Sequence, residues 1–531
     1  MTDAGPEQAQ DDERAGTPEP QDHARPPRDA PPAGGGGVSP RRAFWLSYAL
    51  FFVLFALWSI GNPLTAAPDE PAHATKAAGV VRGQLVGEPV EGEPDGFGWV
   101  RVPNVIWQSQ AYPICYYFKP DITAACEPEE PADPHEIVDA VTTASNYNPL
   151  YYLPVGMPTL LPLGEDMLFA MRLITAAMCA AALAWAVRSL AELRTMSWPV
   201  LGLAAAVTPM VVFLSSTISP AGPEICAAVG LWAGLLVTVH QPDPDRLRTR
   251  MAGVAVLASV LVNLRGMSPL FLALIVGTVV LSAPWANTWT ALRDRRSWPW
   301  LGLVGVASIA ALVWTRTAGS LPESIVAHPS WTFVRAAKTS IHATPTYLKN
   351  MVGEFGWVDT QLPLAMVWAW LAVIAAIAIA ALVRGSWRQR VALALLGFLT
   401  LALPVVIHAW QAKYIGIVWQ GRYFLPAAVG VPLLAGFILR GRPDGAVGAT
   451  APRSAHRLLP WLLGALLGGQ VVALAVNLHR YAVGADGPWF GTVEDVWAPP
   501  VSVPVLLVAC VAVVVWLFRL LRGVAVAQDV P

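Results

Sequence analysis

Apolar stretches, each close to the roughly 20 residues that an α-helix needs to cross a bilayer, recur along almost the whole chain. Lipid cannot satisfy backbone polar groups, so stretches of this kind form helices rather than open sheets. The sequence therefore predicts an all-α integral membrane protein, a polytopic bundle of about 12 transmembrane helices. The expected spans are 43–62, 166–187, 197–216, 221–240, 250–264, 267–284, 299–316, 362–383, 390–410, 422–439, 458–477 and 501–520. The short neighbours 250–264 and 267–284 are alternatively one re-entrant unit.

The charge content agrees with burial in lipid. Only 13% of the 531 residues are charged, whereas soluble globular proteins carry about 25%. The net charge is −1, and no large basic field is present, so a nucleic-acid partner is not expected. The bilayer itself is the expected partner.

The distribution of arginine predicts the orientation. Arg41 and Arg42 precede the first span, and the loops that alternation then puts on the same side hold arginine clusters at 246–250, 293–296 and 384–390. Because cytoplasmic loops are enriched in Lys and Arg, both chain ends are expected in the cytoplasm. The abundance of Arg, Ala and Pro is typical of a GC-rich bacterium, so the bacterial plasma membrane is the expected location.

This topology divides the chain into a membrane domain and two tails. Residues 1–42 are rich in Pro, Gly and acidic residues and are predicted to be a disordered cytoplasmic tail. The transmembrane domain is expected over 43–522, followed by a cytoplasmic tail at 523–531. The two largest polar segments, 63–165 and 317–361, become outer loops. Most of the polar mass outside the membrane is thus expected on one face, where we expect the protein to act.

Two of the five cysteines lie in the first outer loop. Cys115 and Cys126 are candidates for a disulfide because oxidation is available outside the membrane, and two free thiols are the alternative. Cys179, Cys226 and Cys510 lie in apolar runs and are expected to be small core residues.

The first outer loop begins with an acidic helix start, Pro68-Asp69-Glu70-Pro71-Ala72-His73. On the expected helix, Asp69, His73 and Lys76 fall on one face. A carboxylate at the lipid–water boundary is a candidate general base or metal ligand. The plainer interpretation is a helix cap accompanied by solvated charges.

Two further groups of residues are unusual for their expected position. The aromatic segment 146–154, with Tyr151 and Tyr152, is too short to span and is predicted to be interfacial or re-entrant; a plain aromatic belt is the alternative. Charged residues fall where hydrocarbon is expected, which indicates function by default. They are Arg172, Glu224 and Arg265. Helix capping by Glu224 and snorkelling by Arg172 are the alternatives.

Two outer segments carry candidate ligand-binding residues. In 351–360, two glycines and two aromatic residues flank Glu354 and Asp359, and Trp357 is suited to stacking on a sugar ring; an ordinary interfacial turn is the alternative. The second segment contains Lys413 and the pair Arg422-Tyr423. Arginine is a planar, bidentate partner for phosphate, and Lys413 is expected to assist it. A snorkelling anchor is the alternative for Arg422.

Taken in order, four motifs resemble a bacterial family of multi-pass membrane proteins of unknown function that is grouped with the GT-C superfamily of membrane glycosyltransferases. They are Pro68 to His73, Asn148-Pro149-Leu150-Tyr151-Tyr152, Gly353 to Asp359, and Gln420 to Pro426. The resemblance runs from about residue 43 to 480. It implies a GT-C-like fold, a polyprenyl-phosphate-linked sugar donor, and an envelope glycan, lipid or protein acceptor. It also implies that Asp69, just after the first span, is the catalytic or metal-linked carboxylate.

The sequence therefore predicts an inverting glycosyltransferase that acts on the outer face. Asp69 would be the base, with Glu70 and His73 positioning it or binding a divalent metal such as Mg or Mn. Lys413 and Arg422 would bind the lipid phosphate, and the segments 121–139 and around Trp357 would shape the acceptor cleft. A flippase or transporter for a lipid-linked glycan is one alternative. A non-catalytic scaffold for envelope assembly is the other, and no ATP-binding or hydrolase motif is present to favour other chemistry.

Overall fold

The computed structural model describes residues 38–93, 96–193, 197–319, 326, 328–440, 453–489 and 496–526. Most of the predicted N-terminal tail, residues 1–37, lies outside this range, as do residues 527–531 of the predicted C-terminal tail. The first helix begins at Pro40, within the segment that was expected to be tail.

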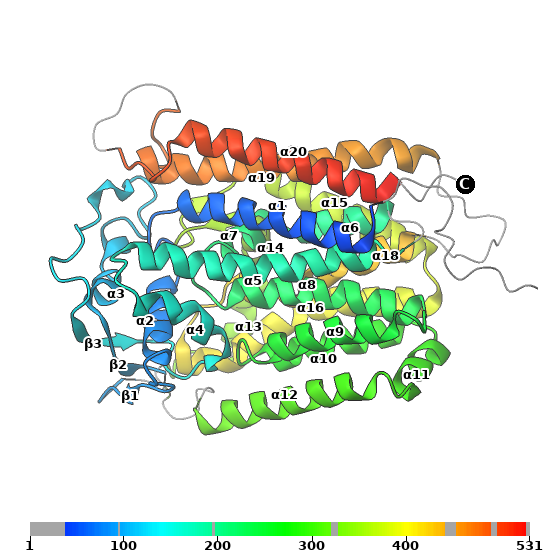
Figure 1. Ribbon diagram of the computed structural model, residues 1–531, viewed down its shortest axis with the longest axis horizontal. Helices are drawn as coiled ribbons and strands as arrows, with labels where there is room; N and C mark the ends of the chain where they lie inside the picture. Colours follow the sequence, from blue (N-terminus) through cyan, green and yellow to red (C-terminus); the bar gives the residue numbers. More distant parts are fainter. Residues whose placement is uncertain are drawn as a thin grey trace, which may run out of the picture. The chain divides into compact units, whose positions relative to one another are not determined.

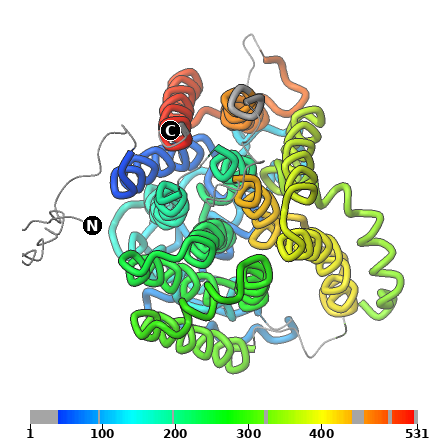
Figure 2. Tube along the Cα trace, turned by 90° about the vertical axis from the view of Figure 1, so that its right-hand side faces the viewer, coloured from blue at the N-terminus to red at the C-terminus, as the bar shows by residue number. Residues whose placement is uncertain are grey.

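The predicted polytopic helical architecture is confirmed. In the described part of the chain, nine helical segments are long and apolar enough to cross a membrane. They are α1 (Pro40–Ile60), α5 (Asp166–Leu190), α8 (Ala221–His240), α12 (Trp298–Thr317), α15 (Leu364–Arg384), α16 (Trp387–Ile415), the run Gly421–Leu439, α19 (Arg453–Val483) and α20 (Val503–Val526). The long helices run roughly side by side (Figures 1 and 2). The expected count of twelve spans stays a prediction.

The other three expected spans differ from a simple crossing. Residues 197–216 form two short helices, α6 (Ser197–Ala206) and α7 (Pro209–Leu214), because Pro209 cannot continue α6 and Thr208 caps α7. The remaining two form α9 (Leu247–Val262) and α10 (Ser268–Ser282), which are 16 and 15 residues long. A 15-residue helix is about 22 Å long, which is shorter than the roughly 30 Å hydrocarbon core.

The core of the bundle is built around α8. Eighteen of its residues, from Ala221 to Val239, are buried, which is the pattern of a helix that is apolar all round and has protein on every side. It packs closely against α5, which in turn packs against α1. At the opposite extreme, α12 buries only Ala311 and lies along one edge of the bundle (Figure 1).

The predicted outer loop 63–165 is a folded unit. Its three antiparallel strands, in the order β1-β2-β3, are β1 (Glu88–Pro89), β2 (Gly98–Pro103) and β3 (Ile137–Thr142). Its helices are α2 (Glu70–Val80), α3 (Asn104–Gln108), α4 (Pro149–Gly156) and the short 3-10 turns η1 (Tyr112–Cys115), η2 (Ala124–Cys126) and η3 (Met157–Leu160). A separate apolar core, including Val100, Val102 and Ile106, joins the sheet to α2 and α4.

The second predicted outer loop, 317–361, is also structured. It forms α13 (Phe333–His342), α14 (Thr344–Gly353) and a small hairpin of β4 (Glu354–Phe355) and β5 (Thr360–Gln361). After the last turn of α16, the chain enters the 3-10 turn η4 (Gly421–Phe424), followed by α17 (Leu425–Ala428) and α18 (Gly430–Leu439).

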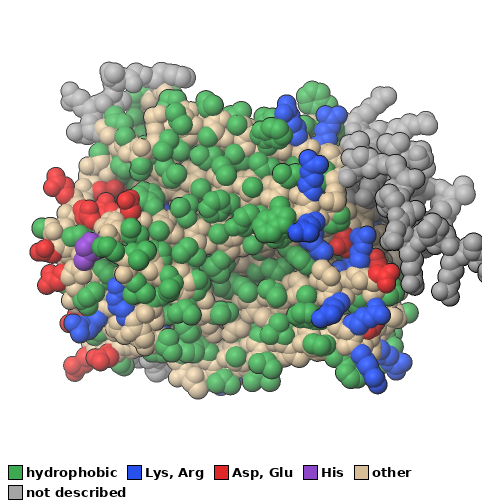
Figure 3. All heavy atoms as spheres, viewed as in Figure 1, with side chains coloured by type: hydrophobic (Ala, Val, Ile, Leu, Met, Phe, Trp, Pro, Cys, Tyr) green, Lys and Arg blue, Asp and Glu red, His purple; other side chains and the backbone are tan. Residues whose placement is uncertain are grey.

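The two ends of the bundle differ in charge. In Figure 3 acidic side chains gather at the end that carries the three-stranded sheet, and most Lys and Arg side chains on this face gather at the other end. The beginning of α1 and the end of α20 both lie at the arginine-rich end (Figure 1). The helix α11 (Trp285–Arg293) also lies there. Charges of opposite sign are therefore segregated along the bundle axis.

Candidate functional site

Asp69 lies at the start of α2 with an unusual backbone. Its φ angle is +64°, in the left-handed region that non-glycine residues rarely adopt. Asp69 occupies the N-cap position of α2, as expected, but its side chain makes no capping hydrogen bond. The carboxylate instead faces Arg422, with Oδ2 3.4 Å from Nη2. The Asp69 side chain is 53% exposed and that of Arg422 only 7%, so the carboxylate is open to a ligand.

Close packing of η4 against α14 positions Arg422. A Cβ atom on Gly421 would collide with the backbone carbonyl of Tyr347, so only glycine fits. The Gly421 N–H donates to Asn350 Oδ1 at 3.2 Å. The Asn350 amide in turn hydrogen-bonds the buried carboxylate of Glu354, and Gln361 donates to the same carboxylate at 2.9 Å. Glu354 therefore orients Asn350, which holds Gly421, the residue before Arg422. Glu354 does not line the site itself.

Arg265 is the second cation of the site. It lies between α9 and α10 and pairs with Glu224 of α8, Nη1 to Oε2, at 3.5 Å. Ser268 also donates to Glu224, at 2.6 Å. The guanidinium of Arg265 lies 5.2 Å from the ring centroid of Tyr423, and that of Arg422 lies 5.3 Å from the same centroid. Two guanidinium groups thus share one aromatic ring, beside an exposed carboxylate.

His73 lies close to Asp69, Arg265 and Arg422 but is a poor base. Its Nδ1 is 2.8 Å from the Tyr152 hydroxyl, and its ring packs edge-on against Tyr147. Burial lowers the pKa of His73 to about 4. The Asp69 carboxylate raises this pKa, and the nearby Arg265 and Arg422 lower it further. The imidazole is neutral at pH 7 and is suited to positioning a group by hydrogen bonding.

Glu70, adjacent to Asp69 in the chain, faces the interior. It forms a fully buried, bidentate pair with Arg172, at 2.7 and 2.8 Å. Arg172 also donates to the carbonyls of Ser59, Asn62 and Pro63, so all five of its N–H groups are used. Both residues thus fasten the end of α1 to α5, and neither presents a free polar group to a ligand.

The predicted metal role gains no support from these contacts. The backbone N–H groups of Ile218 and Ala67 also donate to the Glu70 carboxylate, at 2.9 and 3.3 Å. Within the described residues, no three His, Cys, Asp or Glu side chains converge in a way that could hold a metal ion. A divalent metal at Asp69 stays a prediction.

Two other predicted residues point away from the cluster. The Lys76 ammonium donates to the carbonyls of Leu85 and Ser145, and burial lowers its pKa to about 8. Tyr151 is fully buried, and its hydroxyl lies 2.9 Å from Thr175 Oγ1 on α5. Lys76 thus connects parts of the 63–165 segment to one another, and Tyr151 connects this segment to α5.

Lys413 was expected to assist Arg422. Its ammonium lies over the ring of Tyr414, 4.6 Å from the centroid, and its backbone carbonyl accepts from the His328 N–H at 2.9 Å. The structure therefore places Lys413 with the aromatic residues at the end of α16. The cation that lies beside Arg422 is Arg265, where the sequence had predicted Lys413.

The β4–β5 turn belongs to a second cluster, around Arg480. Asp359 Oδ2 lies 3.1 Å from Arg480 Nη2, and both side chains are buried. Trp357 packs against Tyr117 and Phe118, with ring centroids 5.4 and 5.9 Å away. Sequence reasoning missed Arg480, although a charge at the end of an apolar run was a signal, because the predicted span stopped at residue 477.

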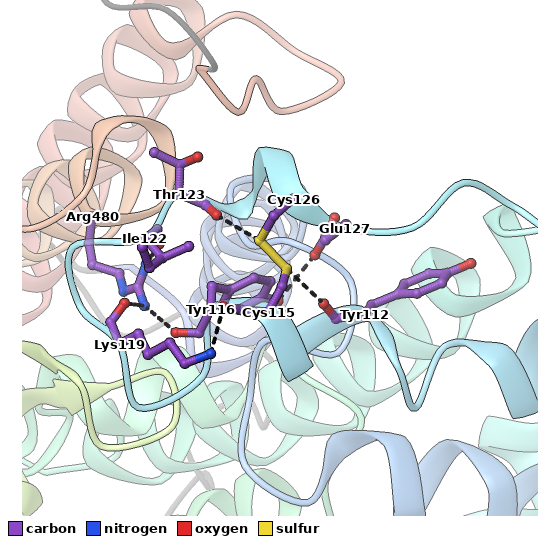
Figure 4. The surroundings of a disulfide bond; sticks show 9 residues. All are labelled: Tyr112, Cys115, Tyr116, Lys119, Ile122, Thr123, Cys126, Glu127 and Arg480. Atoms are coloured by element: carbon purple, nitrogen blue, oxygen red, sulfur yellow. Dashed lines mark hydrogen bonds between the residues drawn. A yellow bond between two sulfur atoms is a disulfide. The ribbon is translucent and has the colours of Figure 1, made fainter.

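A disulfide closes the loop that Arg480 holds. Cys115 and Cys126 are bonded to each other. Arg480 donates to the carbonyls of Tyr116, Lys119 and Ile122 within this loop, at 3.0, 3.0 and 2.7 Å (Figure 4). The 63–165 segment is thereby attached to the end of α19.

Comparison with models of protein families shows the family to which this chain belongs. The model of a family described as "Predicted membrane protein (DUF2142)" matches residues 51–431. The chain belongs to the DUF2142 family. The match includes Asp69, Glu224, Arg265 and Arg422, so the whole cluster lies inside the family region of this DUF2142 protein. No curated protein and no solved structure matches the chain.

Proposed function

We propose that this DUF2142 protein is a GT-C-type membrane glycosyltransferase of the bacterial plasma membrane, using a polyprenyl-phosphate sugar donor. The observation that carries the proposal is the meeting of Asp69, Arg265 and Arg422 around Tyr423. The three charged residues come from segments far apart in the chain. An accessible carboxylate beside two largely buried guanidinium groups pairs a candidate base with a candidate phosphate site.

An apolar cavity is lined in part by residues that follow η4 in the chain, and it suits an apolar segment of the donor lipid. It has a volume of about 190 Å³ and lies between α6, α14, α15, α16, α17 and α18. Leu425, which follows η4 directly, lines it together with Met351 and Val352 of α14. The segment that carries Arg422 therefore continues directly into the wall of this apolar cavity.

The chemistry proposed for the site is a direct displacement. Asp69 accepts the proton of an acceptor hydroxyl while the oxygen of that hydroxyl bonds to the anomeric carbon of the donor sugar. The bond between that carbon and the phosphate oxygen breaks, and Arg422 and Arg265 stabilise the departing phosphate. A phosphate that binds Arg422 also competes with Asp69 for the guanidinium, which frees the carboxylate to act as a base.

The arginine-rich end would be cytoplasmic and the sheet-bearing end external. This proposal rests on the segregation of charge along the bundle and on the preference of Lys and Arg for cytoplasmic loops. The acceptor would then be an envelope glycan, lipid or protein, and both chain ends would be in the cytoplasm.

Binding of polyprenyl phosphate to the purified protein tests the proposal. We expect saturable binding that Arg422→Ala weakens by about ten-fold or more, as befits loss of a charge-assisted contact. Lys413→Ala is the matched control and should leave binding unchanged, because Lys413 lies over Tyr414. Asp69→Asn should keep binding and lose sugar transfer.

Two results would count against the proposal. Binding that is indifferent to Arg422 would remove the phosphate site and favour the scaffold interpretation. Binding that needs Arg422, with net movement of the lipid-linked sugar across vesicles and unchanged activity in Asp69→Asn, would favour a flippase.

A further inference from the structure

The short helix α13 has three distinct faces. Ala336 and Ser340 are buried against α16, where the Ser340 hydroxyl lies 2.8 Å from His408 Nδ1. Phe333, Val334 and Ile341 fall within about 100° of one another around the helix axis, and they are 53, 62 and 58% exposed. The basic residues of the helix form the third face. They are Arg335, Lys338 and His342, all exposed.

The place of α13 in the bundle sets its depth. Its buried face packs on Ala409 and Ala412, in the last turns of the membrane-spanning helix α16. Nearby on α16, Trp410 is 49% exposed, and Tyr414 carries the Lys413 ammonium over its ring. Exposed aromatic and basic residues at the end of a span are typical of the lipid headgroup zone. In Figure 2 the yellow-green segment that holds α13 lies at the edge, outside the helices seen end-on.

The charge of this segment stands out at its end of the molecule. Residues 326–353 contain Arg335, Lys338 and Lys349 and no Asp or Glu, although acidic side chains gather at this end of the bundle. Arg335 is also held in place, because its guanidinium lies 4.4 Å from the ring centroid of Trp331. An apolar face beside a basic face, at headgroup depth, is the pattern of a helix that lies in an anionic lipid surface.

We propose that the α13 surface, made of Trp331, Phe333, Val334, Arg335, Lys338 and Ile341, binds anionic phospholipid. The apolar face enters the acyl-chain boundary, and Arg335 and Lys338 contact lipid phosphates. This inference does not depend on the proposed glycosyltransferase activity. It identifies α13 as a membrane-surface helix connected to the site through α14, whose Asn350 holds Gly421.

Spin labels at single added cysteines test the depth of the helix. The free cysteines Cys179, Cys226 and Cys510 are buried, so an added exposed cysteine is the one to react. In vesicles containing phosphatidylglycerol, labels at Val334→Cys and Ile341→Cys should be relaxed by oxygen and shielded from a water-soluble nickel chelate. A label at Thr143→Cys, exposed beyond β3, is the control and should show the opposite pattern. Labels at 334 and 341 that behave like the control would overturn the proposal.

Lipid retention tests the charge. Arg335→Gln with Lys338→Gln should weaken phosphatidylglycerol binding, measured by native mass spectrometry, by about ten- to thirty-fold, since each basic residue near an anionic surface contributes about 1 kcal/mol. Phosphatidylcholine binding should not change. The matched control is Arg101→Gln with Lys119→Gln, which removes the same charge from exposed positions of the outer unit. Equal loss of phosphatidylglycerol binding in both double variants, or no loss in the first, would contradict the proposal.

In the spin-label experiment, labels at 334 and 341 that are shielded from both oxygen and the nickel chelate would also contradict it. They would mean that a protein partner covers the α13 surface.

Discussion

Asp69 and Glu70 are consecutive residues whose carboxylates lie in opposite surroundings. Asp69 is half exposed beside Arg422, whereas Glu70 is fully buried with Arg172. The positive φ angle of Asp69 turns its side chain outward at the start of α2. A strained backbone at an exposed carboxylate is a common feature of functional sites, where the surrounding structure maintains it.

The strain at Asp69 predicts a difference in stability between two variants that both lose the contact with Arg422. Asp69→Gly should have a free energy of unfolding about 1 kcal/mol higher than Asp69→Ala, because glycine adopts positive φ without steric cost. Thermal unfolding in detergent measures this, and sugar transfer should be lost in the same variant. Asp69→Ala keeps the strain and is the control, so equal stability of the two variants would contradict this reading of the backbone.

The Glu70–Arg172 pair should be essential for folding. Glu70→Ala leaves a buried, uncompensated guanidinium, which costs about 3–5 kcal/mol. The double variant Glu70→Leu with Arg172→Met should recover much of this loss, because no buried charge remains unpaired. Unfolding curves of the two variants test the pair, and a double variant as unstable as Glu70→Ala would show that the carbonyl contacts of Arg172 dominate.

His73 predicts a pH dependence of stability. Its pKa falls from 6.5 in the unfolded chain to about 4 in the folded protein, so the unfolded state binds more protons between these values. Stability therefore rises as the pH increases from about 4 to 6.5, by at most about 3 kcal/mol, and the His73 contribution is constant above that range. Unfolding measured across this interval should show a smaller slope in His73→Asn than in the wild type. An unchanged slope would assign the dependence to other groups.

At the scale of elements, one loop of the 63–165 segment connects this segment to α19. The disulfide closes residues 115–126, and Arg480 of α19 binds three carbonyls inside this loop. The same guanidinium pairs with Asp359 of the β4–β5 turn. The disulfide loop, the turn and α19 therefore form one connected unit.

Loss of the disulfide should loosen this unit. Replacing Cys115 and Cys126 by serine should reduce the free energy of unfolding by about 2–3 kcal/mol, because a short closed loop restricts the unfolded chain. Hydrogen exchange at residues 116–122 should increase more than exchange in α8. Cys510→Ser, at a buried free thiol of α20, serves as the comparison. Exchange that stays the same in 116–122 would show that Arg480 alone orders the loop.

The elements were predictable where one physical requirement decides them. Most spans could be recognised from sequence because lipid forces long apolar stretches into helices. The break at Thr208 could not, because the residues on both sides are apolar and the capping of α7 depends on its neighbours. The small sheet was missed because its short strands are stabilised by packing on α2 and α4.

The site was predictable as residue types and not as an arrangement. Asp69, Arg265 and Arg422 each stood out, since a charge near lipid is costly. Their meeting around Tyr423 depends on tertiary packing, such as the contact of Gly421 with Tyr347. Sequence proximity therefore favoured Lys413 as the partner of Arg422, whereas the fold supplies Arg265.

For the whole molecule, the segregation of charge predicts one orientation in the membrane. A cysteine introduced at Thr143, in the sheet-bearing end, should react with an impermeant thiol reagent added to intact cells. A cysteine at Arg295, near α11 in the arginine-rich end, should react only after the membrane is opened. The two positions are both exposed, so they form a matched pair. The reverse pattern would invert the topology and place the site on the cytoplasmic face.

The edge helix α12 has a different consequence at this scale. It buries one side chain and packs on α9. Hydrogen bonds also join it to other segments: the Trp314 indole donates to the Asn146 carbonyl at 3.0 Å, and Asn263 donates to the Ala307 carbonyl at 3.2 Å. The tilt of α12 is therefore expected to depend on the thickness of the bilayer. In a thinner membrane α12 will tilt to match the hydrocarbon, pivoting on Asn146, while α1 and α5, clamped by Arg172, keep their angle. A change in membrane thickness would then shift the loop that carries Asn146 and Tyr147.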